Sequence, residues 1–170
     1  MGEKAASLFL QQGHKSAAAI LTKSLNRAMD YRNKGFIETC EKNGIEILHE
    51  NIISADNSLH GGFTAGEEFI KIKNAPKALF CNSDSIALGI LNVLNREKIS
   101  VPKNVEIIAI GMTDNEYTKF STPPITIVDI PIEKMAGKCI ELIYDMLNQK
   151  LEKPTSVFVD APLIIRNSCI

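Results

Sequence analysis

The sequence predicts an α/β protein in which a parallel sheet is flanked by helices on both faces. Short apolar segments alternate along the chain with longer segments whose apolar residues recur at helical spacing. The short segments are apolar nearly throughout, which is typical of parallel strands buried on both faces. With 170 residues, 45% of them hydrophobic and 23% charged, the chain has the size and composition of a globular unit of this class.

The first part of the chain predicts a helix, a strand and a second helix. Residues 2–12 place apolar side chains at helical spacing, and Gly13 ends that helix. Residues 16–21 form a short apolar run that fits a buried strand. Residues 30–43 return to helical spacing, and Gly44 fits the position just after a helix. This order of elements is the beginning of a parallel sheet with crossover helices.

The middle of the chain continues the alternation. We expect a strand at 45–52 and, after a polar loop, a helix near 62–72. A buried strand at 78–82 leads directly into a helix at 84–97. The clearest strand is 105–111, because β-branched residues dominate it and a glycine ends it. Successive strands of this kind pair in parallel, with right-handed crossovers.

The last part of the chain predicts one more strand, a long helix and two short strands. The strand is at 125–130, and Pro131 is well suited to the first position of the helix that follows. That helix covers 131–149, and short strands are expected at 155–161 and 163–166. We find no internal repeat and no low-complexity segment in the sequence.

Polar residues stand where two of these strands end, which is where ligands gather in parallel sheets. Asn82, Ser83 and Asp84 follow one strand, and residues 111–114 follow another. Asp84 has two interpretations. It can cap the helix that begins there, since free amide hydrogens and the helix dipole favour an anion. It can also accept hydrogen bonds from ligand hydroxyls, while Ser83 provides the cap.

Composition and motifs argue against several classes of function. A net charge of −1 with scattered lysines and arginines does not favour nucleic-acid binding by this chain alone. The four cysteines form no C-x-x-C pair, so neither disulfides nor a zinc site is indicated, and we expect no metal or cofactor. Sequence signatures of hydrolases, phosphate-binding loops and zinc proteases are absent, so we expect no enzyme. We predict a cytoplasmic location, because the sequence contains no signal peptide and no membrane-spanning run.

The segment PKALFCNSDSIALGILNVLNREKISVPKNVEIIAIG resembles the effector-domain core of the lactose-repressor/galactose-repressor family of transcriptional regulators. Three further pieces resemble family motifs in the same order, namely GHKSAAAIL, STPPITIVDIPIEKMAG and LIIRNS. The resemblance covers nearly the whole chain. It implies a fragment of the C-terminal effector-binding domain, in which this chain is one lobe of a periplasmic-binding-protein-like (type I) two-lobe domain.

The resemblance also implies how the chain divides. Residues 1–170 match mostly the second lobe, and about 120–150 match the segment that packs with the first lobe in the family. The family's helix-turn-helix DNA-binding domain has no counterpart in these residues. We therefore expect contact with operator DNA only through an N-terminal domain outside this chain.

Four residues are assigned to effector binding by the resemblance. Arg32 matches the arginine of the family motif R-x-x-G-F, and its guanidinium can donate paired hydrogen bonds to sugar oxygens or to a carboxylate. Asp84 matches the family's effector aspartate. Asn26 falls where the family often has a polar contact, and Asn57 stands near the position of a stacking aromatic. From the residues alone, a surface arginine on helix 30–43 is the favoured interpretation of Arg32, and the family motif reverses that preference.

The function that the resemblance implies is small-molecule sensing and dimerisation within a transcriptional repressor. The expected effector is a sugar or a sugar phosphate, the expected assembly is a homodimer, and no membrane partner is expected. The alternative is a sugar-binding protein of a transport system, because such proteins share the two-lobe fold. The sequence upstream of Met1 would separate these two functions.

Helix 131–149 carries a continuous apolar stripe at helical spacing. Its members are residues 132, 135, 136, 139, 140, 143, 146 and 147. A stripe of this size is not expected to face water in a stable monomer. We therefore expect it to be covered by the same chain or by a second copy.

Overall fold

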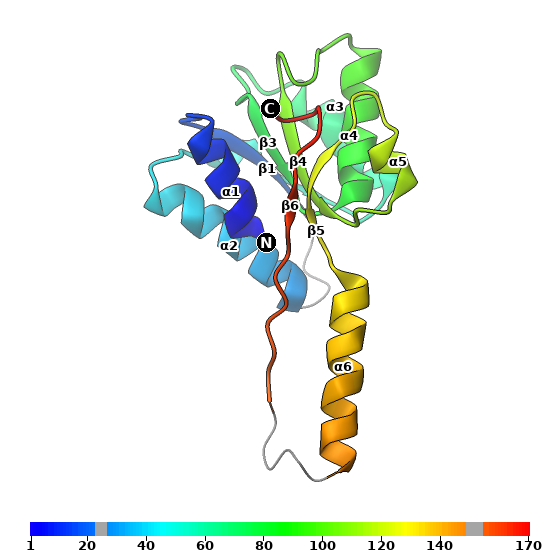
Figure 1. The fold of residues 1–170 in the computed structure, drawn as a ribbon. Helices are drawn as coiled ribbons and strands as arrows, with labels where there is room; N and C mark the ends of the chain where they lie inside the picture. Colours follow the sequence, from blue (N-terminus) through cyan, green and yellow to red (C-terminus); the bar gives the residue numbers. More distant parts are fainter. Residues whose placement is uncertain (23–26, 149–154) are drawn as a thin grey trace.

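The computed structural model describes residues 1–22, 27–148 and 155–170, and it places helices and strands in alternation along the chain (Figure 1). The elements are α1 (Gly2–Gln11), β1 (Ala17–Thr22), α2 (Arg27–Lys42), the 3-10 helix η1 (His49–Asn51), β2 (Ile52–Ala55), α3 (Leu59–Phe69), β3 (Ala78–Cys81), α4 (Asp84–Arg96), β4 (Glu106–Gly111), α5 (Glu116–Lys119), β5 (Thr126–Asp129), α6 (Ile132–Leu147) and β6 (Leu163–Ile164).

The strands form one sheet in the order β2-β1-β3-β4-β5-β6. The pairings from β2 to β5 are parallel, while β5 and β6 pair antiparallel. The predicted parallel sheet is therefore confirmed, with a short antiparallel strand at one edge. Strands β3 and β4 lie in the centre and are buried along their whole length, as their apolar sequences predict.

Helices α1 and α2 cover one face of the sheet (Figure 1). Three aromatic rings fill the space between them and the strands. Phe36 of α2 stacks on Phe80 of β3 with ring centres 4.1 Å apart, and Phe9 of α1 meets Phe36 edge-on at 6.2 Å. The small side chains of β1, including Ala17 and Ala19, belong to the same core and leave room for these rings.

Helices α3 and α4 cover the opposite face, so the prediction of helices on both faces is also confirmed (Figure 1). Their buried side chains, among them Phe69, Ile86 and Leu94, form a second core against the sheet. The two helices approach each other closely at Gly62, where a Cβ atom would lie 2.2 Å from the carbonyl oxygen of Ile86. Only glycine allows this contact between the two backbones.

Two predicted strands are wrong. Within 45–52, the chain makes a single bridge from Glu46 to Ser16 and then forms η1, so the strand β2 begins only at Ile52. The segment predicted as a strand at 155–161 has no strand partner in the described chain, and Phe158 is 97% exposed. Alternating apolar residues are not sufficient for a strand when no neighbouring strand is within reach.

Helix α6 extends away from the sheet, beyond the end of β5 (Figure 1). It has no buried residue, and Ile140 and Leu147 of the apolar stripe are 68% and 79% exposed. The expectation that the same chain covers this stripe is therefore wrong for the described residues. Helices α1 to α4 pack on the two faces of the sheet, and none of them covers α6. Coverage by a second copy stays a prediction. None of the helices in the described ranges has the length and apolarity needed to cross a membrane.

Candidate functional site

The candidate site lies at the carboxyl ends of the parallel strands, which share one edge of the sheet. Strand β1 ends at Thr22, β3 leads into Asn82 and Asp84, and β4 leads into the loop that contains Asn115. Because parallel pairing brings these ends together, residues far apart in sequence become neighbours here.

Asp84 is the first residue of α4, and both of its carboxylate oxygens accept a hydrogen bond. Oδ1 accepts from the backbone N–H of Ser85 at 2.8 Å, and Oδ2 accepts from Nδ2 of Asn115 at 2.7 Å. Ser83 occupies the N-cap position but its side chain makes no capping bond, so the expectation that Ser83 caps the helix is wrong. The partly buried carboxylate of Asp84 still has lone pairs for further donors.

Gly111, the last residue of β4, is what allows Asp84 to lie across the strand end. A Cβ atom at this position would be 2.7 Å from Cβ of Asp84 and 2.9 Å from its Oδ2. A larger residue would push the carboxylate out of this position. The glycine that ends the predicted strand therefore also shapes the site.

Arg32 lies on α2 and is close enough to Asp84 for their charges to interact. Burial lowers the pKa of the Arg32 guanidinium from its ordinary value, and the Asp84 carboxylate opposes that change. Within the described residues, Arg32 makes neither a hydrogen bond nor an ion pair, so its donors are available. The structure thus brings Arg32 and Asp84 to the same edge of the sheet.

Arg32 also lines a groove of about 510 Å³ between the sheet body and α6, which we call the α6 groove. Asp84 is not among its lining residues. The groove is mostly apolar, with Lys138 as a second cation. It is lined by Met1, Ala28, Tyr31, Arg32, Ile130, Pro131, Met135, Lys138, Cys139, Leu142, Val157, Phe158, Val159 and Ala161.

The two predicted asparagines have different outcomes. Asn26 lies outside the described residues. Asn57 is exposed in the turn between β2 and α3, and within the described chain it forms no hydrogen bond. No hydrogen bond of the described chain joins Asn57 to Arg32 or Asp84, and the assignment of both asparagines remains a prediction.

Asn82, which the sequence placed at a strand end without a role in effector binding, is a positioning residue. Its buried amide nitrogen donates to Oγ1 of Thr22 at 2.8 Å and to Oδ1 of Asn33 at 2.7 Å. These bonds tie the ends of β1 and β3 to α2, next to Arg32. Its Oδ1 is buried and has no hydrogen-bond partner in the described part of the chain. The sequence signal that could have predicted this positioning role was an amide side chain directly after the buried strand β3.

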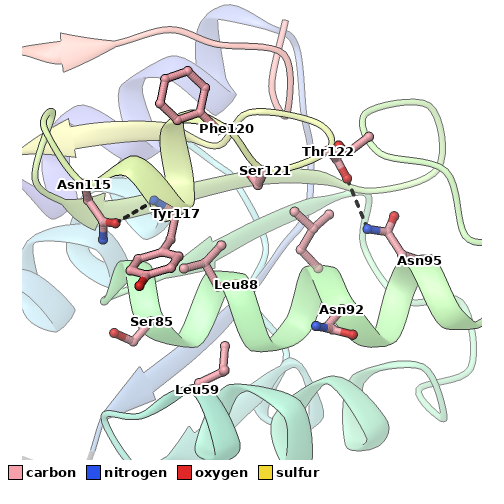
Figure 2. A pocket seen from close by; sticks show the side chains of 11 residues that line it. Leu59, Ser85, Leu88, Asn92, Asn95, Asn115, Tyr117, Phe120, Ser121 and Thr122 are labelled. Carbon is pink, nitrogen blue, oxygen red and sulfur yellow. Dashed lines mark hydrogen bonds between the residues drawn. The ribbon is translucent and has the colours of Figure 1, made fainter.

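A second hollow, of about 660 Å³, lies along α4 and is called the α4 groove here (Figure 2). Its side chains come from the start of α3, from α4 and from the segment 115–122, as Figure 2 shows. Tyr117 and Phe120 border it and are 80% and 70% exposed. The lining residues are Leu59, Ser85, Leu88, Leu91, Asn92, Asn95, Asn115, Tyr117, Phe120, Ser121 and Thr122.

The described residues include no group of three or more His, Cys, Asp or Glu side chains that could hold a metal ion. The charged groups at the strand ends include the guanidinium of Arg32 and the carboxylate of Asp84, together with the carboxylate of Asp129 at the end of β5. Arg32 and Asp84 suit a neutral polyol or an anion that arginine can bind, and they sit where α/β proteins bind small molecules. The fold and the site together define the chain as part of an α/β ligand-binding domain.

A family model described as a periplasmic binding protein-like domain matches residues 6–169. The chain therefore belongs to the periplasmic binding protein-like domain family, and it is similar in sequence and structure to LacI-type transcriptional regulators. The resemblance found in the sequence is thereby confirmed.

The relatives are transcriptional regulators. The HTH-type transcriptional repressor CytR of Escherichia coli K12 is 28% identical, over 96% of this chain and 48% of its own. The crystal structure of a LacI family transcription regulator from Clostridium acetobutylicum has a TM-score of 0.93 and 64% identity, over 98% of this chain and 62% of that one. The transcriptional regulator CelR–cellobiose complex has a TM-score of 0.87 and 25% identity, over 98% and 50%. The chain spans about half the length of the curated relatives it matches.

Proposed function

We propose that this chain is the effector-sensing and dimerisation part of a transcriptional repressor. The observation that carries the proposal is the placement of Arg32 and Asp84 within electrostatic reach of each other at the carboxyl ends of the strands. Among the described residues, the Arg32 guanidinium has no hydrogen-bond partner and the Asp84 carboxylate has free lone pairs, and such a combination suits a polyhydroxylated ligand. The relatives named as repressors favour this function over a sugar-binding protein of a transport system.

The proposed effector is a sugar or a sugar phosphate. Hydroxyl groups of a sugar donate to the free lone pairs of Asp84, while Arg32 donates to ring oxygens, hydroxyls or a phosphate. The CelR relative, described as a complex with cellobiose, supports the sugar class. Binding involves no catalytic step, so we expect no turnover of the effector.

We further propose that the effector lies between this lobe and a first lobe of the longer protein. The exposed stripe of α6 supports this arrangement, because an apolar helix face of this length needs a covering surface. Residues of about 120–150 would then be the segment that packs with the first lobe. Contact with operator DNA would be made in the cytoplasm by a separate domain, and effector binding would change its affinity through lobe closure.

The proposed homodimer forms across the α4 groove. Exposed Tyr117, Phe120 and Leu59 surround this groove, and aromatic residues of this kind are enriched in protein interfaces. The amides of Asn92 and Asn95 can serve both as donors and as acceptors. A surface with both capacities can pair with a copy of itself across a twofold axis.

The test of the effector site is isothermal titration calorimetry of the two-lobe protein with glucose, cellobiose, glucuronate and glucose 6-phosphate. We expect at least one of these to bind, and Arg32→Ala and Asp84→Ala each to weaken it about tenfold or more. Arg96→Ala is the matched control, because that arginine is exposed, forms its ion pairs with Glu67 and Glu97, and lies on α4 away from Asp84. Unchanged affinity in both site variants would remove the assignment.

A further inference from the structure

Asn115 lies between the candidate effector site and the α4 groove, and its side chain is bonded at both ends. Its Nδ2 donates to Oδ2 of Asp84 at 2.7 Å. Its Oδ1 accepts from the backbone N–H of Tyr117 at 3.0 Å, which caps the N-terminus of α5 (Figure 2). One amide therefore connects the site carboxylate to the helix that borders the groove.

Helix α5 depends on such anchors, because its four residues are too few to form a stable helix unaided. It carries Tyr117, and Phe120 follows directly, so its position sets the shape of the groove rim. A second anchor comes from the other side. Arg166 donates to Oγ1 of Thr118 at 3.3 Å and to the carbonyl oxygen of Thr113 at 3.0 Å.

The anchor formed by Arg166 and the anchor formed by Asp84 through Asn115 differ in whether a bound effector can reach them. Arg166 holds the loop from the β6 side, where it also donates to the carbonyl oxygen of Ile125 within the sheet body. Asp84 holds Asn115 from the edge that carries the candidate effector site. Of these two anchors, a ligand at the strand ends reaches the one formed by Asp84.

We propose that Asn115 is a positioning residue that couples effector binding at Asp84 to the pairing of two copies across the α4 groove. This inference rests on the proposed function above. A ligand hydroxyl that donates to Oδ2 of Asp84 shares that oxygen with the Asn115 amide, and the shared charge weakens the bond from Asn115 to Asp84. The cap on α5 then loosens, and Tyr117 and Phe120 move. Because linkage is reciprocal, pairing that fixes α5 changes effector affinity by the same factor.

The first test needs no effector. Sedimentation velocity of the 170-residue chain gives the dimer dissociation constant of the wild type, Asp84→Ala, Asn115→Ala and the double variant. We expect each single change to raise the dissociation constant about tenfold, as loss of a charge-assisted hydrogen bond does. We expect the double variant to be no weaker than either single variant. Additive effects would overturn the coupling.

The variant Asn115→Asp separates capping from the link to Asp84. Aspartate caps a helix as well as asparagine does, so a residue that only caps predicts pairing like the wild type at every pH. A link to Asp84 instead places two carboxylates within hydrogen-bond distance, where one of them takes up a proton more readily. Pairing should then be weak at pH 7.5 and recover toward pH 5. Arg32 faces this pair from α2, and Asp114 and Glu116 flank it, so wild type and Asn115→Ala are measured at both pH values.

The control variant is Glu41→Ala, an exposed residue of α2, which covers the opposite face of the sheet from the α4 groove. It should pair and exchange like the wild type. Hydrogen exchange at the Tyr117 amide, measured at concentrations where the chain is monomeric, should speed up about tenfold in Asp84→Ala. Unchanged exchange there would refute the link through Asn115. A wild type that stays monomeric at every concentration would refute the pairing itself, and with it the coupling.

Discussion

The sheet body and helix α6 have similar amphipathic patterns but opposite environments. Helix α4 buries seven of its residues between the sheet and α3, including Ile86, Ile90 and Leu94. Helix α6 is three residues longer and buries none. In the described chain its stripe faces solvent, with Ile140 68% exposed, and only Met135 and Cys139 of the stripe line the α6 groove.

The difference shows that an apolar stripe predicts burial of a helix face, whereas actual burial also requires a partner surface in the same chain. The apolar stripe of α6 encodes a buried helix as clearly as the pattern of α4 does. A stripe specifies that a partner exists, but the partner's identity depends on which other surfaces are present. The α6 stripe is therefore evidence for a covering lobe or copy, and the stability of the body should not depend on it.

The largest expected contrast is in hydrogen exchange. Amides of α4 open only with global unfolding, whereas a 16-residue helix with no buried side chain is marginal in water. We expect α4 amides to exchange more slowly than α6 amides by a factor of about a thousand or more. Peptide-resolved exchange with mass spectrometry measures this difference. Equal protection in both helices would show that α6 is covered in solution.

The next largest effect concerns the aromatic core. Phe36→Ala should lower the free energy of unfolding by about 3–5 kcal/mol. The Phe36 ring contacts both Phe9 and Phe80, so its removal leaves a cavity between them. Urea denaturation followed by circular dichroism measures the loss. Tyr31→Ala on the same helix is the matched control, since Tyr31 is exposed and should change stability by less than about 0.5 kcal/mol. Similar losses in both variants would contradict the assigned core.

A smaller, pH-dependent effect is expected at Glu106, at the opposite edge of the sheet from the candidate site. Burial by itself would raise the pKa of this carboxyl, but hydrogen bonds from Lys77, His14 and Cys169 outweigh burial and hold the pKa below 4.5. The ionised form therefore stabilises the fold above pH 4.5, and this contribution is lost as the pH falls through the lowered pKa.

Glu106→Gln should accordingly cost about 1–3 kcal/mol at pH 7 and flatten the loss of stability below pH 4.5. Thermal melts between pH 3 and pH 7 measure both quantities. Glu67→Gln is the control, because Glu67 forms an exposed ion pair with Arg96 that is worth little. A variant at residue 106 whose stability follows the wild-type pH profile would contradict the buried network.

The sequence predicted the elements that carry their own signal. Strands β3 and β4 are recognisable because each is apolar and stands beside a helical pattern, and Asp84 was placed correctly at a strand end. Helix α5 was not predicted, since four residues show no periodicity. The hydrogen bond from Asn115 to Asp84 joins residues 31 positions apart, so only the folded sheet brings them together.

The site itself was predicted in part. Position at the carboxyl edge followed from the residues, while the roles of Arg32 and Asp84 came from the resemblance. The ties of Asn82 to Thr22 and Asn33 depend on the order of β1 and β3 in the sheet, which no single segment of sequence specifies. Residues that position other residues are harder to predict than residues that bear charge, because their signal lies in tertiary contacts.

The smallest expected effect gives the sharpest test of the difference between α4 and α6. Ile140→Lys on α6 should change the free energy of unfolding of this chain by less than about 0.5 kcal/mol, since Ile140 is exposed and lysine favours helices. Ile90→Lys, the same change at a buried position of α4, should abolish folding. Urea denaturation at two protein concentrations measures both. A loss for Ile140→Lys that grows with concentration would mean that a second copy covers the stripe, whereas a loss independent of concentration would mean that the chain covers it itself.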